Sequence, residues 1–201
     1  MMRVLLASAA LALALGGAAQ ATVIFSDNFD GEALGAPQPN LTNWNVTSGT
    51  VDVIGQPGFF EFYPGNGRYI DLNGSPGAGR IETKNPLALI AGKRYAISFD
   101  YGNNKNSNNV EQLSFGIDGK TWVIDIPGAI PDLIAAARTF VYGGGSATLF
   151  FADTGLASPK DNGGPILDNV KVALVPLPAG GLMLLAGFGG LALLRRRKAA
   201  A

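Results

Sequence analysis

One carboxylate stands in the sequence where apolar side chains are expected. The run Ile166–Val172 has a β-like pattern in which Asp168 shares the parity of Ile166, Val170 and Val172. Alternate residues of a strand lie on one face, and a carboxylate among inward apolar neighbours is unfavourable unless it is paired or bound to a metal. Calcium takes oxygen ligands, so Asp168 is a candidate ligand. The alternative is that Asp168 caps a turn or accepts backbone N–H bonds.

A second set of residues could bind a sugar. Such a site needs an exposed aromatic ring against the C–H face of the sugar, with directional polar groups beside it. Aromatic residues occur near turns, and the polar run Asn103–Asn109 predicts a surface loop. The candidates are Trp122, Trp44, Tyr63, Asn104 and Asn106. The alternatives are that most aromatic side chains form the core and that the loop only aids solubility.

The missing residue types exclude several chemistries. The chain has no His and no Cys, which removes the Ser-His-Asp triad, thiol nucleophiles, disulfides, iron–sulfur clusters and zinc sites with His or Cys ligands. No nucleophile elbow or phosphate-binding loop occurs. The 15 Asp and Glu residues show no spacing that singles out a glycosidase pair. We therefore predict no catalytic residues.

The central region predicts an all-β domain with a sandwich or jelly-roll architecture, because many short strand-like runs alternate with Gly, Pro and Asn turns. Asp118-Gly119 predicts a tight hairpin, since a type I′ turn needs positive φ. The only helix-like piece is Pro131–Ala137. The predicted strands are Val23–Phe29, Val51–Ile54, Phe59–Tyr63, Arg68–Leu72, Gly79–Thr83, Tyr95–Tyr101, Gln112–Ile117, Thr121–Ile126, Arg138–Tyr142, Ala147–Ala152 and Ile166–Leu174.

Residues 1–21 have the pattern of a signal peptide. Arg3 precedes the apolar run Val4–Leu15, and Ala19-Gln20-Ala21 is a cleavage pattern before Thr22. We expect signal peptidase to remove this segment. The alternative is an uncleaved anchor helix.

The C-terminal segment, residues 175–201, predicts a transmembrane helix. Its apolar stretch is about 20 residues long, enough to cross a bilayer. The basic cluster that follows, Arg195, Arg196, Arg197 and Lys198, is expected to stay cytoplasmic and to leave the domain, residues 22–174, outside the inner membrane. The alternative is a plain single-pass anchor.

The order of a short motif, an apolar helix and a basic end resembles the VPLPA type of PEP-CTERM sorting signal. The motif consists of Val175, Pro176, Leu177, Pro178 and Ala179. The resemblance implies that an exosortase recognises the tail in the inner membrane, cuts near the motif, and releases or transfers the protein to the cell surface or the extracellular space.

The middle of the chain contains a series of short pieces in a fixed order, among them Asp27-Asn-Phe-Asp30, Gly79-Arg-Ile-Glu-Thr83 and Gly164-Pro-Ile-Leu-Asp-Asn-Val170. This order resembles the choice-of-anchor surface domains, which have a galactose-binding-like jelly-roll fold. Jelly-roll carbohydrate modules commonly hold a structural calcium ion where the first and last strands meet. The resemblance implies that Asp27, Asn28 and Asp30 would join Asp168 in such a site.

The net charge of residues 22–174 and the targeting patterns at the two ends together predict the function. Residues 22–174 contain ten Lys and Arg and fifteen Asp and Glu, a net charge of −5, which disfavours nucleic acid and anionic membranes as partners. We expect an exported, exosortase-processed, non-catalytic surface or matrix protein that binds an exopolysaccharide. A structural protein without a ligand and a polysaccharide hydrolase are the alternatives.

Overall fold

The computed structural model describes residues 21–75, 77–106, 109–128, 130–154 and 163–176, and every regular element in these ranges is a β-strand. Residues Ala21–Val175 form one compact unit. The predicted signal peptide, the transmembrane helix, the basic cluster and the residues Leu177, Pro178 and Ala179 lie outside the described residues. Within the described residues, no helix is long and apolar enough to span a bilayer.

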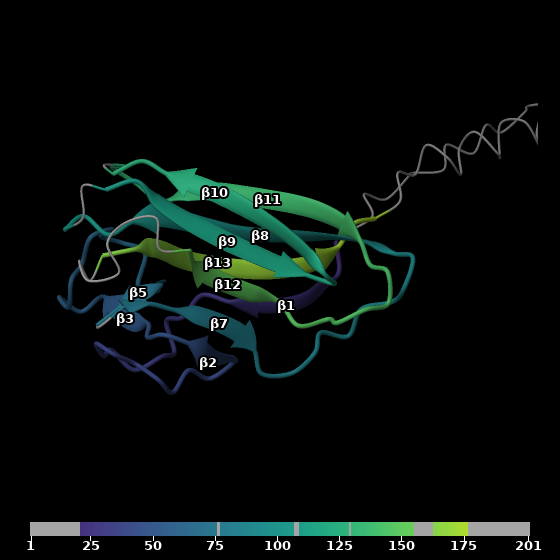
Figure 1. Ribbon diagram of the computed structural model, residues 1–201, viewed down its shortest axis with the longest axis horizontal. Helices are drawn as coiled ribbons and strands as arrows, with labels where there is room; N and C mark the ends of the chain where they lie inside the picture. The colour runs from purple at the N-terminus through teal and green to yellow at the C-terminus, as the bar shows by residue number, and fades with distance from the viewer. Residues whose placement is uncertain (1–20, 76, 107–108, 129, 155–162, 177–201) are drawn as a thin grey trace, which may run out of the picture. The chain divides into compact units, whose positions relative to one another are not determined.

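The strands form two antiparallel sheets that face each other (Figure 1). The six-stranded sheet has the order β11-β8-β13-β4-β3, and β1 also pairs with β13. Its strands are β1 (Val23–Asp27), β3 (Asp52–Gly55), β4 (Arg68–Asp71), β8 (Arg94–Asn103), β11 (Ile134–Val141) and β13 (Pro165–Leu174).

The five-stranded sheet has the order β10-β9-β12-β7-β2. Its strands are β2 (Trp44–Ser48), β7 (Arg80–Thr83), β9 (Glu111–Ile117), β10 (Lys120–Ile126) and β12 (Phe150–Asp153), and a small ladder joins β5 (Asn73–Gly74) to β6 (Gly77–Ala78). The chain passes repeatedly from one sheet to the other, as in a jelly roll. The all-β prediction is therefore confirmed for the described residues.

Aromatic side chains fill the space between the sheets. Phe99 of β8 projects from the six-stranded sheet, and its ring centroid lies 4.7 Å from that of Phe115 and 5.1 Å from that of Phe151 in the other sheet. Trp44 packs edge-on against Phe151 at 5.9 Å. All four side chains are buried. Edge-on and offset contacts of this kind add to the gain from burial alone, so the two sheets are held together by this layer.

Two predicted elements are wrong. The helix-like piece Pro131–Ala137 overlaps the start of β11, whose residues Ala135–Ala137 pair with Asp100–Ser98 of β8. At the edge of the sheet, the backbone of this segment forms interstrand hydrogen bonds with β8. This pairing overrides the helix preference of alanine. The predicted strand Phe59–Tyr63 is part of a loop, residues 56–67. Three strands were not predicted: β2, whose pattern is mostly polar, and the two-residue strands β5 and β6.

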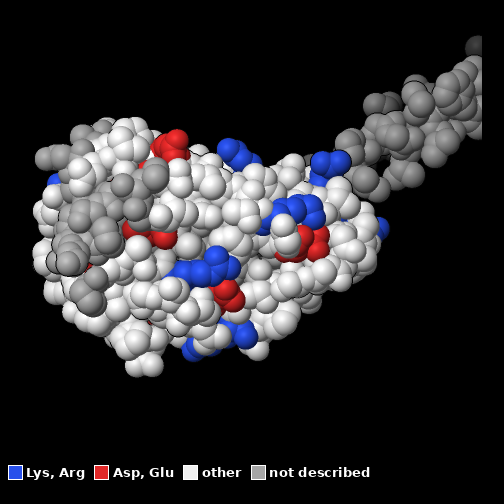
Figure 2. Space-filling view, in the orientation of Figure 1, with Lys and Arg blue, Asp and Glu red and all other residues white. Residues whose placement is uncertain are grey.

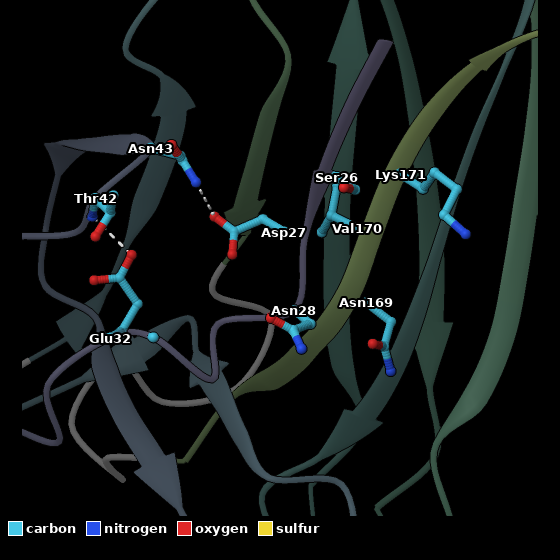
Figure 3. A pocket seen from close by; sticks show the side chains of 10 residues that line it. Ser26, Asp27, Asn28, Glu32, Thr42, Asn43, Asn169, Val170 and Lys171 are labelled. Atoms are coloured by element: carbon cyan, nitrogen blue, oxygen red, sulfur yellow. Dashed lines mark hydrogen bonds between the residues drawn. The ribbon is translucent and has the colours of Figure 1, made fainter. Parts of the chain in front are cut away.

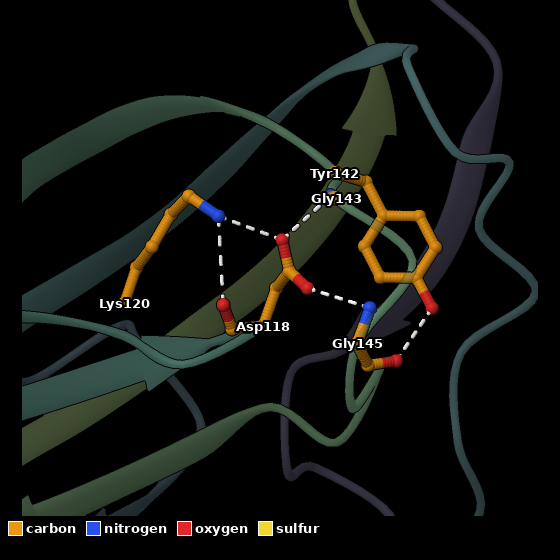
Figure 4. A network of polar contacts seen from close by, with 5 residues as sticks. All are labelled: Asp118, Lys120, Tyr142, Gly143 and Gly145. Atoms are coloured by element: carbon orange, nitrogen blue, oxygen red, sulfur yellow. Dashed lines mark hydrogen bonds and ion pairs between the residues drawn. The ribbon is translucent and has the colours of Figure 1, made fainter.

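The predicted hairpin is confirmed at the β9–β10 turn. Asp118 and Gly119 have φ values of 56° and 72°, and Ile117 pairs with Lys120. The Asp118 carboxylate also accepts hydrogen bonds from the backbone N–H of Gly143 at 2.7 Å and of Gly145 at 2.9 Å (Figure 4). Lys120 Nζ lies 2.6 Å from Asp118 Oδ2. The ion pair with Lys120, followed by the bond from Gly143, lowers the pKa of Asp118.

We predict that Asp118→Ala lowers the melting temperature by several degrees. The change leaves two backbone donors and Lys120 without their acceptor and puts alanine at a positive φ. Asp118→Asn should have a smaller effect, because asparagine tolerates positive φ and keeps one acceptor oxygen. Thermal unfolding measures both, with Asp132→Ala at an exposed position as the control. Equal melting temperatures for all three variants would contradict the prediction.

Candidate functional site

A polar pocket lies at the end of the six-stranded sheet, where β3 begins and β4 ends. It encloses about 300 Å³. Oxygen- and nitrogen-bearing side chains form one part of its lining, and an exposed aromatic ring and an aliphatic side chain form another. These residues are Asp52, Asp71, Ser75, Asn104, Asn106, Phe60 and Ile54. We call it the loop pocket.

Two carboxylates lie side by side in the loop pocket. Asp52 is the first residue of β3, Asp71 is the last residue of β4, and the two are direct partners in the antiparallel register. Directly opposed residues share a face of the sheet, with Cβ atoms about 5 Å apart. Asp52 is 6% exposed and Asp71 is 1% exposed. The strand pairing therefore forces two buried acids into proximity.

Only uncharged donors bind these carboxylates. Asp71 accepts hydrogen bonds from the Asn73 N–H at 2.8 Å and from Asn104 Nδ2 at 2.6 Å. Asp52 Oδ1 accepts one from the Ser75 N–H at 3.2 Å, and no described residue donates to Asp52 Oδ2. The ion pairs between described residues, Arg80–Glu82 and Lys120–Asp118, involve neither acid. The negative charge thus has no cationic partner in the described chain.

Burial without a cation changes the acidity of both groups. Burial raises the pKa of Asp71 to about 8; the hydrogen bonds from Asn104 and Asn73 oppose this shift, and the charges of Asp52 and Asp153 add to it. Burial raises the pKa of Asp52 to about 6. Near neutral pH, Asp52 is therefore largely ionised, whereas Asp71 largely keeps its proton.

The loop of residues 56–67 carries the aromatic ring of the pocket. Tyr69 of β4 holds this loop, because its hydroxyl accepts the N–H of Phe62 at 2.7 Å and of Tyr63 at 3.1 Å. Phe60 has φ 52° and is 51% exposed. A bulky residue rarely adopts positive φ, and such outliers persist where the surroundings impose them, often at functional sites.

The segment after β8 supplies the amides. The Tyr63 hydroxyl donates to the Asn103 carbonyl oxygen at 2.6 Å and accepts the Asn103 N–H at 2.9 Å. These two hydrogen bonds to the backbone of one residue fix the position of the next residue, Asn104. Its Nδ2 donates to Asp71, and its Oδ1 accepts the Asn106 N–H at 2.9 Å. The structure thus brings two of the predicted ligand residues, Asn104 and Asn106, into one pocket.

Two other predicted ligand residues are wrong. Trp44 is fully buried, and its Nε1 donates to Asp27 Oδ2 at 2.9 Å. Tyr63 is 2% exposed and acts through its hydroxyl. Neither ring can stack on a sugar, because both face protein atoms. Trp122 is half-buried and packs against Phe115 at 5.5 Å and Phe140 at 6.3 Å.

Four residues of the pocket were not predicted from the sequence: Asp52, Asp71, Ser75 and Phe60. A signal for the two acids was present, since each lies next to apolar residues in a predicted strand, as Asp168 does. Parity alone would not have marked them, because Asp52 alternates with Thr50 and Ile54, and Asp71 with Tyr69 and Asn73. They are buried because both faces of β3 and β4 are covered. Their pairing was not visible, because it depends on the register of β3 against β4.

Two of the residues predicted to bind calcium, Asp27 and Asn28, line an open polar hollow of about 680 Å³ where β1 meets β13 (Figure 3). Asp27 points toward Asn43 there, and its Oδ2 accepts Asn43 Nδ2 at 3.0 Å. Its Oδ1 accepts the Phe29 N–H at 2.9 Å. Asp30 accepts the Arg68 N–H at 2.9 Å and Asn28 Nδ2 at 2.6 Å. These carboxylates already bind protein donors.

Asp168 is buried, with 1% exposure, as its parity predicts. Its Oδ1 accepts the Asn169 N–H at 2.6 Å. Burial raises the pKa of Asp168 to about 7, with smaller contributions from Asp100, Asp30 and Asp27. Within the described residues, no group of three or more His, Cys, Asp or Glu side chains could hold a metal ion. A calcium ion at Asp168 would therefore require Asp27 or Asp30 to rearrange.

Comparison with solved structures supports the fold. The CBM22-1 xylan-binding domain of Xyn10C from Paenibacillus barcinonensis matches with a TM-score of 0.50 and 14% identity, over 79% of this chain and 97% of that one. The tandem CBM22-1–CBM22-2 domain of the same protein matches with a TM-score of 0.51 and 13% identity, over 78% and 46%.

The CBM22-1–GH10 modules of an endo-1,4-β-D-xylanase from Clostridium thermocellum, solved with xylohexaose, match with a TM-score of 0.50 and 13% identity. The match covers 79% of this chain and 30% of that one, so this chain spans under a third of the two-module structure. No family model and no curated protein matches the sequence. The likeness is one of fold: the chain has the jelly-roll fold of carbohydrate-binding modules.

We predict that the domain is less stable at about pH 8 than at about pH 5. The folded-state pKa of Asp71 lies above its ordinary value, so the folded state binds more protons than the unfolded state over this range, and stability falls as pH rises. The pKa values of Asp52 and Asp168 are also raised and act in the same direction. Melting temperatures measured across this pH range test the prediction. Each kcal/mol of lost unfolding free energy should lower the melting temperature by about 2–4 °C.

Asp71→Asn should flatten this profile and raise the melting temperature at about pH 8, because asparagine is never charged. The exposed Asp132→Asn is the matched control and should keep the slope. A profile for Asp71→Asn as steep as that of the natural chain would show that Asp71 does not carry the dependence.

Proposed function

We propose that this chain is an exported, non-catalytic protein whose β-sandwich binds a polysaccharide at the loop pocket. One observation carries the proposal: the exposed ring of Phe60 lies at the same pocket as the buried carboxylates of Asp52 and Asp71 and the amides of Asn104 and Asn106. A ring accepts the C–H face of a sugar, while carboxylate and amide groups bind its hydroxyls directionally.

The size and rigidity of the pocket suit this use. Ligand pockets start at about 300 Å³, so a volume of about 300 Å³ fits one or two sugar units of a longer chain. Tyr69 and Tyr63 fix both loops before any ligand arrives, and preformed sites lose less entropy on binding. The xylan-binding domain and the xylohexaose complex that share the fold support a polysaccharide as the ligand.

The charge distribution supports the exclusion of nucleic acid. On the face in Figure 2, Lys and Arg side chains are mixed with Asp and Glu and form no continuous basic patch. Binding to nucleic acid draws mainly on such patches. We keep the sequence prediction that nucleic acid is not a partner.

The arrangement of the acids favours binding over hydrolysis. Glycosidases place two carboxyl groups on opposite sides of the bond that is cut. Asp52 and Asp71 are instead direct neighbours on adjacent strands, and both oxygens of Asp71 accept hydrogen bonds. A release of reducing ends from a polysaccharide by the purified protein would establish the hydrolase alternative.

We further propose export and sorting from the signals at the two ends of the chain. The N-terminal pattern would direct the chain to signal peptidase, and the C-terminal motif, helix and basic cluster would present it to an exosortase at the inner membrane. The mature domain would then reach the surface or matrix, where an exopolysaccharide is available. Deletion of residues 175–201 is expected to redirect the protein to the periplasm or the medium.

We predict that Phe60→Ala weakens polysaccharide binding about tenfold, because a stacked ring contributes about 1–1.5 kcal/mol. Titration calorimetry with an oligosaccharide identified on a glycan array measures the change. Ile90→Ala, at another exposed apolar residue, is the control and should bind normally. Unchanged binding by a folded Phe60→Ala variant would refute this site, and the failure of every glycan to bind would favour the structural alternative.

Calcium remains a prediction of the sequence. If calcium binds at Asp168, a chelator should lower the melting temperature and added calcium should raise it, because a ligand of the folded state stabilises that state. Asp168→Asn should abolish the difference, whereas Asp132→Asn should not. Identical melting temperatures with calcium and with chelator would contradict calcium binding at this site.

A further inference from the structure

We infer that the loop pocket selects glycans with a free amine, such as polymers of glucosamine, over neutral or acidic glycans. This inference rests on the proposed function and adds the chemical class of the ligand. The feature that carries it is the paired, nine-tenths buried carboxylates of Asp52 and Asp71, which no described cation compensates.

Two described cations on the segments that form the pocket, Lys105 and Arg68, bind elsewhere. Lys105 Nζ donates to the Pro131 carbonyl oxygen at 2.9 Å and lies 4.4 Å from the centre of the Tyr63 ring. Arg68 Nε donates to the Gln56 carbonyl oxygen at 3.3 Å, and its guanidinium also binds the Glu32 carbonyl oxygen. Both side chains are therefore occupied by backbone oxygens and not by Asp52 or Asp71.

A metal ion fits the pocket less well than an ammonium group. Calcium requires about six to eight oxygen ligands, and the described residues offer no cluster of three acids or metal-binding side chains. Both oxygens of Asp71 already accept hydrogen bonds. An ammonium group needs only a few acceptors, and Asp52 Oδ2, which no described residue engages, provides one at the pocket wall.

The position of Phe60 fits an amino sugar as well. Its exposed ring lines the same pocket as Asp52, so a sugar that stacks on the ring can present an amine to the acid. A nearby cation also interacts favourably with the face of an aromatic ring. Acidic sugars would meet the like charge of Asp52 and the added negative potential of Asp153, and this repulsion would discriminate against them.

Binding of an amine should also move a proton. A ligand that arrives as an ammonium group stabilises the ionised form of Asp71, whose carboxyl group then gives its proton to the solvent. An uncharged amine would take that proton itself, so the measurement is made at a pH at which the amine is protonated. This proton release would make the measured heat depend on the buffer, whereas a neutral glycan that leaves Asp71 protonated would show no such dependence. The dependence is therefore a signature of charge pairing in the pocket.

The test compares two ligands that differ only in the amine. Calorimetry of the folded domain with a chitosan tetramer, which carries free amines, and a chitin tetramer, which is acetylated, should give at least about tenfold tighter binding of chitosan. The preference should weaken at high salt. Asp52→Asn should bring the ratio of the two affinities close to one, with melting temperature as the check on folding. Asp132→Asn should keep the ratio.

The outcomes separate this inference from the proposed function. Equal affinity for the two tetramers, or a preference that survives Asp52→Asn, would overturn the selection of amines while leaving polysaccharide binding intact. A preference for oligogalacturonate, an acidic glycan, would overturn it as well. Failure of these and all other glycans to bind would overturn the proposed function itself.

Discussion

The two sheets of this domain depend on one layer of interlocked aromatic rings. Phe99 from the six-stranded sheet contacts Phe115 and Phe151 from the other sheet, and Trp44 extends the layer toward the first strand. No disulfide can take over this role, because the chain has no Cys. Close packing between the sheets makes a rigid frame, and the loops at its ends can then hold polar groups in positions that a flexible chain would not maintain.

The aspartates show how the surroundings give one residue type different roles. Asp27 accepts hydrogen bonds from the indole N–H of Trp44 and from a backbone N–H. The indole N–H of the aromatic layer therefore has an acceptor. Asp118 binds a lysine and two backbone donors and closes a turn. Asp52 and Asp71 have only neutral donors and each other. The first two stabilise the frame, whereas the last two form an acidic pair whose charge no described cation balances.

Much of the fold could be predicted from local patterns. In the predicted strand Tyr95–Tyr101, alternation puts Tyr95, Ile97, Phe99 and Tyr101 on one face; the first three are buried and Tyr101 is half-buried. The Asp118-Gly119 pair specified its hairpin because few residues tolerate positive φ. The site was predicted only in part. Asn104 and Asn106 were found from the polar run, but Trp44 and Tyr63 were misassigned, since composition does not show whether a ring faces protein or solvent.

The sequence by itself determined the all-β class, the hairpin, the burial of Asp168 and the absence of thiol and imidazole chemistry. These features depend on residue type and on alternation along one strand. Only the tertiary structure decided that Asp52 lies opposite Asp71, that Tyr69 and Tyr63 fix the two loops, and that Phe60 is exposed at the resulting pocket. These depend on the register between strands that are distant along the chain, and a shift of one residue would turn both acids to the other face.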